Sequence, residues 1–371
     1  MPHDTLIRLR PRGDTLFVHQ NRTVLATGRD GFIDGGACCG LFVQQTRLLS
    51  RYRYRVDGEA PLPVALSAVE PHTWLGYYLL PVLRTPEGAA GGTGGRVGAP
   101  GAAQHAVELK LSRSVGDGLH EDVDVTNFTQ EPVTLRLTLE VDADFADQEE
   151  APGSRRQQGE RTREWREVDG SAWELRFDYR IEHAYDRQGN TGTARLHRGA
   201  ILQLTRADSV PQHEDGVVAF ELSLPPRGHW HACVALLPVI DGRRLTPGRG
   251  CRPFGLVQGG YDEKREAFLA EATGFRSRES ETSAPIVIGA LRQAEKDLAA
   301  LRLYDFDHGE RAWTLSAGIP IYVALFGRDV LTAAWQAALA GREPMRGSLR
   351  ELSRWQGTEV NDWRDEQPGR M

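Results

Sequence analysis

The sequence predicts a mainly β protein with a helical C-terminal part, in which an antiparallel β-sandwich precedes the helices. Three observations predict this fold class. Apolar and polar residues alternate from Thr15 to Ile240, turn dipeptides separate the alternating segments, and helical spacing begins after Tyr261. At 371 residues, the chain is long enough for two domains or for one domain and part of another.

Alternating segments dominate the first part of the chain. The clearest run from Leu135 to Val141, from Trp173 to Tyr179 and from Val218 to Leu224, and this pattern is typical of strands that bury one face. Asp-Gly pairs, which favour tight hairpin turns, begin at positions 57, 117, 169 and 241. Because no helical segment intervenes to cross over between parallel strands, we expect an antiparallel sandwich.

Helical spacing replaces the alternation in the C-terminal part. Ser283 and Pro285 suit the N-cap and the first turn of a helix, and apolar residues then recur at helical intervals from Ile288 to Leu301. Two further helices are predicted from Val330 to Ala338 and from Leu349 to Trp355.

The change of period divides the chain into three expected segments. Residues 1–275 are predicted to form the sandwich domain, residues 276–310 a helical linker, and residues 311–371 the beginning of a helical domain.

Composition and charge exclude several classes of partner. The formal net charge of −6 and the pI near 6.0 argue against a nucleic-acid surface, which needs an uncompensated cluster of basic residues. The N-terminus has no continuous apolar stretch of the signal-peptide kind, and the apolar run from Ala232 to Ile240 is too short to span a membrane. We therefore expect a cytoplasmic protein without a membrane partner.

Neither the cysteines nor the histidines have the spacing of a metal motif. Cys38 and Cys39 are adjacent, whereas Cys233 and Cys251 stand alone, which predicts reduced thiols. His229 and His231 point to the same face of a predicted strand, with no third ligand evident in the sequence. Neither a metal nor a cofactor is predicted.

The segment that indicates a ligand-binding site reads Phe-Gly-Arg-Asp, from Phe326 to Asp329, at the start of a predicted helix. Asp329 there can interact with the helix dipole, and Arg328 can pair with it. The same guanidinium and carboxylate can instead bind adjacent sugar hydroxyls. Phe326, Tyr322 and Trp313 are then candidate aromatic walls for sugar rings, with core packing as the alternative for each.

Four blocks of the sequence resemble the amylo-α-1,6-glucosidases and glycogen-debranching-type glycosidases. Ser316 to Asp329 is similar to that family's "AGIPWF…LFGRD" pattern, and Arg354 to Arg370 to its "QG…D…RDEEPGK" pattern. In the N-terminal part, Gly40 to Gly58 and Asn127 to Asp147 are similar to its "GLF…DTRFLS" and "DFAD" blocks. One departure is Gln45, where the family usually has an aspartate.

The resemblance implies a second domain that is an (α/α)6 six-hairpin barrel with a sugar site at one end. It further implies that Arg328 and Asp329 hold glucose at the cleavage subsite. Trp363, Arg364 and Asp365 would lie on a loop at the barrel mouth, either shaping that site or forming a charged surface loop. The expected ligand is an α-glucan or an oligosaccharide, and the oligomeric state is left open.

Hydrolysis in this family is inverting and needs a carboxylic acid and a carboxylate base roughly 6.5–9.5 Å apart. The resemblance implies that both groups are downstream of Met371, so we expect this glycoside hydrolase segment to be inactive alone. This chain also departs from the family pattern at Gln367 and in the residues after it.

Two other functions remain open. A non-catalytic module that binds carbohydrate or a partner protein would expose aromatic residues on one sheet face, and Trp165, Trp173 and Trp230 are the candidates, with core packing as their alternative. A sugar phosphorylase could share the architecture. The glycine-rich run from Gly91 to Gly95, however, lacks the flanking strand and helix of a phosphate-binding loop.

Overall fold

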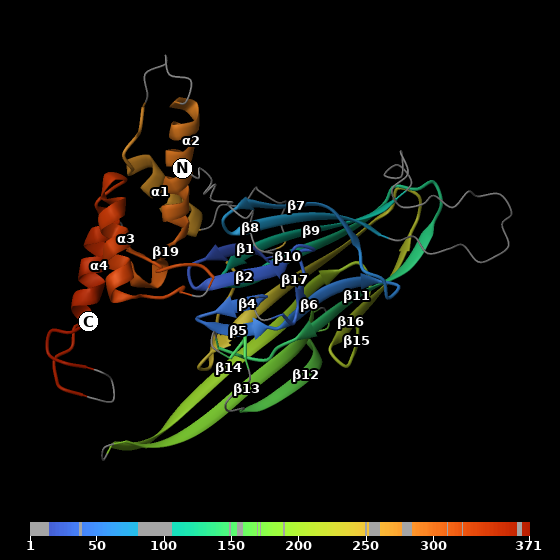
Figure 1. Ribbon diagram of the computed structural model, residues 1–371. Coiled ribbons are helices and arrows are strands. Elements are labelled where there is room, and N and C mark those ends of the chain that lie inside the picture. Colours follow the sequence, from blue (N-terminus) through green and yellow to red (C-terminus); the bar gives the residue numbers. More distant parts are fainter. Residues whose placement is uncertain are drawn as a thin grey trace, which may run out of the picture.

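The structure is a computed structural model that describes residues 15–36, 39–80, 106–147, 150–153, 159–168, 170, 172–187, 190–248, 251, 260–276, 284–309, 311–320, 322–361 and 366–371. Antiparallel strands fill its N-terminal part and helices follow them, which confirms the fold class predicted from the sequence (Figure 1).

Three antiparallel sheets build the sandwich. One sheet has the order β1 (Thr15–Gln20), β2 (Thr23–Gly28), β4 (Gly40–Val43), β5 (Thr46–Leu49). Another has the order β15 (Gln212–Glu214), β16 (Val217–Leu224), β11 (Val133–Asp142), β6 (Arg51–Val56), β3 (Ile33–Asp34). The largest has the order β12 (Glu160–Val168), β13 (Ala172–Arg187), β14 (Asn190–Ala207), β17 (His229–Ile240), β10 (Gly118–Asn127), β9 (Val107–Gly116), β8 (Thr73–Leu80), β7 (Leu62–Glu70), with β18 (Arg243–Arg244) beside β17.

The three predicted alternating segments are strands β11, β13 and β16. In β11, Leu137 and Leu139 are fully buried while Thr138 between them is not, as the two-residue period requires. Apolar faces from all three sheets meet in one continuous core, which holds the buried side chains of the sandwich. Burial of this apolar area is the main favourable contribution to the stability of the sandwich.

Two turns use Asp-Gly pairs that the sequence indicates, whereas at Asp117 and Gly118 only the glycine has a positive φ. Asp57 and Gly58 both have positive φ, at 49° and 85°, and Asp241 and Gly242 repeat this at 48° and 83°. Two consecutive residues with positive φ match the right-handed twist of the flanking strands, and the Asp-Gly pair adopts this conformation readily. Asp169 lies outside the described residues.

A buried ion pair crosses the interior between the sheets. Arg113 on β9 and Glu121 on β10 are 1% and 0% exposed, and the Arg113 Nε donates to the Glu121 carboxylate. The hydroxyls of Tyr52 and Tyr54 donate to the same carboxylate, each at 2.6 Å. Because its oxygens accept from three donors, the Glu121 charge is compensated inside the core.

The helical part contains α1 (Gly260–Glu271), α2 (Ala284–Ala300), α3 (Gly327–Gln336) and α4 (Glu343–Arg354), with a small hairpin of β19 (Arg302–Leu303) and β20 (Thr314–Leu315). Helices α2, α3 and α4 correspond to the three predicted helices; Ser283, the predicted N-cap of α2, lies outside the described residues. The last strand of the sandwich, β18, ends at Arg244, so α1 lies within the range predicted for the sandwich domain.

The helices gather at one end of the sandwich, beside the sheet of β1, β2, β4 and β5 (Figure 1). Val24 of β2 packs there with Leu303 and Val323. Among the described residues, none of the helices combines the length and apolar character that crossing a membrane would require.

Candidate functional site

A hollow of about 570 Å³ lies at the junction between the small N-terminal sheet and the helical part. Its lining comes from both parts: Arg22, Gln44, Gln45, Phe306, Ala324, Leu325, Gly327, Leu352, Trp355 and Met371. The hollow therefore draws together chain segments that are distant in the sequence, and Gly327 belongs to the predicted Phe-Gly-Arg-Asp segment.

The β4–β5 turn forms the sandwich side of the hollow. Its two residues, Gln44 and Gln45, have φ of 47° and 68°, a left-handed conformation that glycine or asparagine adopts more easily. Such backbone strain persists where the surrounding structure fixes it, and it is often found at binding sites. Gln45, the residue that departs from the family pattern, thus faces the junction.

Arg47 anchors this turn to a distant segment of the chain. Its Nε and Nη2 donate to the two oxygens of Asp144, at 3.1 and 2.5 Å, and its Nη1 donates to the carbonyls of Gly36 and Cys39. The backbone N–H of Arg47 also donates to the carbonyl of Ala146 at 2.8 Å. The two N-terminal blocks of the resemblance, which contain Arg47 and Asp144, therefore meet through a bidentate ion pair.

Arg22 connects the sandwich to the helical side of the hollow. Its Nε lies 2.7 Å from the Asp305 carboxylate, and its guanidinium lies over the Phe306 ring, 4.6 Å from the centroid. A guanidinium held by both a carboxylate and an aromatic face loses little further entropy on binding.

The predicted sugar-binding pair occupies the first turn of α3. Asp329 is in that turn, as expected, and its carboxylate lies 3.8 Å from Nη2 of Arg328. The side chains of Arg328 and Asp329 are 89% and 50% exposed. At this distance and exposure, the two charges interact weakly with each other and keep most of their hydrogen-bonding capacity for a ligand.

Two of the three predicted aromatic residues lie close to this pair in sequence and remain accessible. Tyr322 and Phe326 are 57% and 36% exposed, and their rings meet edge to face at 5.5 Å. Trp313, the third, is fully buried against Phe268, so it packs in the core. Trp363, Arg364 and Asp365 lie outside the described residues.

Sequence reasoning missed the functional potential of Trp355. The residue has helical spacing at the end of α4, which indicates packing, yet its side chain is 66% exposed and lines the hollow. Its Nε1 donates to the buried carboxylate of Glu351 at 2.7 Å, and His308 Nε2 lies 2.8 Å from the same carboxylate. Glu351 therefore fixes the orientation of an exposed tryptophan, and no local sequence signal distinguishes this from core packing.

The tryptophans of the sandwich do not form an exposed platform. Trp230 is 4% exposed and meets Phe220 edge to face in the core. Trp165 and Trp173 stack on each other at 5.5 Å and pack against the core. All three tryptophans therefore pack in or against the core, which is the alternative interpretation of these residues in the sequence.

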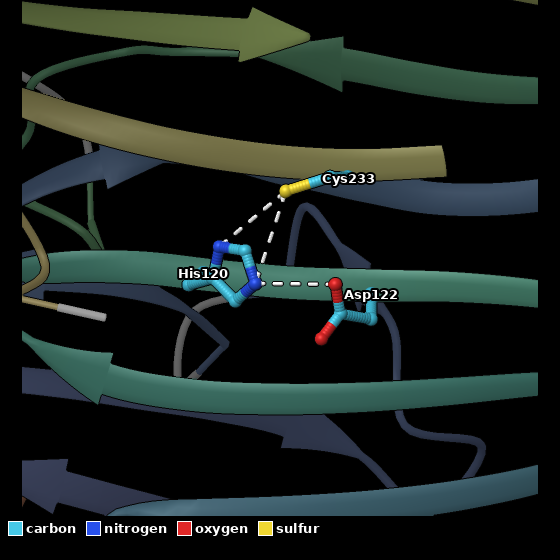
Figure 2. A group of neighbouring side chains, drawn as sticks. All are labelled: His120, Asp122 and Cys233. Carbon is cyan, nitrogen blue, oxygen red and sulfur yellow. Dashed lines mark hydrogen bonds and ion pairs between the residues drawn. The ribbon is translucent and has the colours of Figure 1, made fainter. Parts of the chain in front are cut away.

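Side chains of the types that can ligate a metal lie close together elsewhere, on and beside the large sheet. Two groups have donor atoms within 4.8 Å of one another: His120, Asp122 and Cys233 (Figure 2), and Asp122, His231 and Cys251. In the second group, His231 lies near Asp122 and Cys251, two possible ligands that are distant from it in the sequence.

Comparison with known proteins gives one family match. A family described as the N-terminal domain of (some) glycogen debranching enzymes matches residues 18–235, more than half of the chain. No curated protein matches significantly.

Several solved structures share weak similarity, each at 8% sequence identity. A galactose mutarotase-like protein from Clostridium acetobutylicum matches with a TM-score of 0.32, over 61% of this chain and 95% of its own. A putative kojibiose phosphorylase from the human microbiome also has a TM-score of 0.32, over 77% of this chain, which spans only 31% of the phosphorylase. A galactose mutarotase related enzyme from Lactobacillus acidophilus reaches 0.27, over 64% of this chain and 99% of its own. TM-scores this low do not establish a common fold.

Proposed function

Because the chain belongs to the family of N-terminal domains of glycogen debranching enzymes, we propose that it is the N-terminal part of a debranching-type α-glucosidase. In this proposal the enzyme acts on α-glucans or α-glucosides. The sandwich supports the first helices of an (α/α)6 barrel, and the hollow at their junction lies beside the glucose-binding subsite.

The observation that carries the proposal is the open Arg328–Asp329 pair at the start of α3, in a segment that also lines the hollow through Gly327. A guanidinium donates hydrogen bonds and a carboxylate accepts them, so together they can bind two adjacent hydroxyls of one sugar. Tyr322, Phe326 and Trp355 offer accessible aromatic faces on which the apolar face of a sugar ring can rest.

Within the same proposal, the inverting hydrolysis uses a general acid and a general base that the family places downstream of Met371. The acid must stay protonated at the leaving oxygen while the base, on the opposite face of the sugar, activates water. Arg328 and Asp329 then hold the glucose unit between these two groups rather than taking part in proton transfer.

Titration calorimetry with a branched α-1,6-linked malto-oligosaccharide tests the binding role. Each charge-assisted hydrogen bond contributes about 1.5–3 kcal/mol, so Arg328→Ala and Asp329→Asn should each weaken binding by about ten- to hundredfold. Arg350→Ala, which removes an exposed arginine of α4, is the matched control and should bind like the unmodified chain. Equal affinity in all four proteins would contradict the proposal.

Glucose release from branched α-glucan tests the catalytic part. We expect release by the polypeptide extended downstream of Met371 and none by residues 1–371 alone. Release by residues 1–371 that disappears in Asp329→Asn would show that the catalytic carboxylates lie within this chain.

A further inference from the structure

A row of polar side chains crosses strands β10 and β17 in the large sheet. In the antiparallel register, Asp122 stands opposite Cys233 and Asp124 opposite His231. Because side chains alternate between the two faces of a strand, these residues share one face, while Val123 and Ala232 between them point into the core. The register therefore brings together ligand-type residues that are more than 100 positions apart in the sequence.

The first group of donors is buried. His120 and Cys233 are 4% and 2% exposed, and the Asp122 side chain is 14% exposed. His120 Nε2 lies 3.2 Å from Asp122 Oδ1, and Cys233 Sγ lies 3.8 and 3.9 Å from the two ring nitrogens of His120 (Figure 2). A tetrahedral zinc site with ordinary bond lengths separates its nitrogen, oxygen and sulfur ligands by roughly 3.3–3.6 Å, close to these spacings.

The second group adjoins the first through Asp122. His231 Nε2 lies 3.2 Å from Cys251 Sγ and 3.8 Å from Asp122 Oδ1. One carboxylate oxygen is thus shared by both groups, and the two cysteines approach it from different segments of the chain.

Asp124 fixes the imidazole of His231 in the orientation that a metal ligand needs. Its Oδ1 lies 2.8 Å from His231 Nδ1. When Nδ1 of His231 donates to this oxygen, the Nε2 lone pair of the neutral ring faces Cys251 and Asp122. Ligating histidines are typically held by a carboxylate in this way.

The donor set itself favours a cation at this point. A thiol loses its proton when its sulfur ligates a divalent metal ion, so binding at Cys251 releases a proton.

We propose that this chain binds one divalent transition-metal ion of the zinc class between β10 and β17, through Asp122, His231 and Cys251, beside the buried donors His120 and Cys233. Sulfur and imidazole donors select zinc over magnesium or calcium, which prefer oxygen ligands. The ion would tie Cys251 to the sheet, so its role is structural and independent of sugar binding.

Metal analysis of the complete 371-residue chain, stripped with a chelator and reloaded with zinc, tests the proposal. We expect one equivalent of zinc after desalting, with proton release in calorimetry. Replacement by Co²⁺ should give a thiolate-to-cobalt charge-transfer band. Asp122→Asn, which keeps the side-chain size, and Cys251→Ser should each reduce zinc affinity by about tenfold or more, and Asp124→Asn by about 10- to 100-fold.

Cys39→Ser removes a buried cysteine in another part of the sandwich and is the matched control, with unchanged zinc affinity. Three results would each overturn the proposal: no zinc retained, equal affinity in all variants, or a Cys233–Cys251 disulfide in the freshly purified protein. Should Cys251→Ser fail to fold, the cobalt spectrum of the unmodified chain decides, since the absence of a thiolate band there excludes cysteine ligation.

Discussion

Two arginine–carboxylate pairs in this molecule have the same chemistry and opposite surroundings. Arg113 and Glu121 are almost fully buried and share their hydrogen bonds with two tyrosines, whereas Arg328 and Asp329 are 89% and 50% exposed, 3.8 Å apart, and largely solvated. Breaking a buried pair leaves an uncompensated charge in the core, while an exposed pair contributes little to stability. The first pair therefore serves the fold, and the second is available to a ligand.

The same contrast extends to the regions that contain these pairs. The sandwich buries most of its apolar side chains in one large cluster, while the helical part has small clusters around Trp313 and around Leu303. Three apolar side chains are more than half exposed: Trp335 on α3, Leu349 on α4, and Leu339 in the 3₁₀ turn between these helices. Less buried apolar area means that the helical part should open locally at a lower free energy than the sandwich.

The largest effect is expected from Arg113→Met. The substitution leaves Glu121 charged and buried without its cation, which should lower the free energy of unfolding by about 3–5 kcal/mol. Urea unfolding measures it, and Arg328→Met, the matched exposed change, should stay within about 0.5 kcal/mol. Adding Glu121→Leu to Arg113→Met should recover much of the loss. Equal effects of the two single changes would refute the contrast between the pairs.

Acid should destabilise the junction between the two regions through His19. Burial lowers its pKa from 6.5 to about 4, although Asp297 of α2 partly offsets this. Between pH 6.5 and pH 4 the unfolded chain binds a proton that the native state does not, so stability falls as pH falls and the loss is complete below about pH 4. The expected loss is about 2–3 kcal/mol.

His19→Gln should remove this part of the pH dependence when unfolding is measured in urea at several pH values. An unchanged profile in the variant would assign the acid sensitivity to other groups.

A smaller effect is expected from Asp144→Asn, which weakens the ion pair that holds the β4–β5 turn. Arg47 is 5% exposed and loses a bidentate carboxylate, so we expect a loss of about 2 kcal/mol in the free energy of unfolding. Asp215→Asn removes the partner of Arg163 in a pair whose aspartate side chain is 90% exposed, and it should cost less than about 1 kcal/mol. A reversed order of the two would show that the turn is not anchored through Arg47.

The smallest effect is expected from Trp335→Gln on α3. Because the side chain is 72% exposed, the free energy of unfolding should change by less than about 0.5 kcal/mol, while aggregation measured by light scattering should decrease. Leu137→Ala in the sandwich core is the contrasting change and should cost about 2–5 kcal/mol. A large destabilisation by Trp335→Gln would mean that this face of α3 is packed in solution.

Parts of the candidate site were predictable from the sequence, and parts were not. Phe326, Arg328 and Asp329 are contiguous, and a helix start recognisable from local pattern places them together. Trp313 and Trp355 have similar local signals, yet one is fully buried and the other lines the hollow, because burial depends on which distant segments pack over a residue.

By itself, the sequence determined the fold class, the strands β11, β13 and β16, the three C-terminal helices and the Asp-Gly turns at positions 57 and 241. All of these depend on neighbours within a few residues, since side-chain period and turn preference are local properties. Only the tertiary structure decided that Arg47 meets Asp144 and that Asp122 meets Cys233. These contacts depend on the register between strands far apart in the chain, which the packing of the whole sandwich sets and no short pattern encodes.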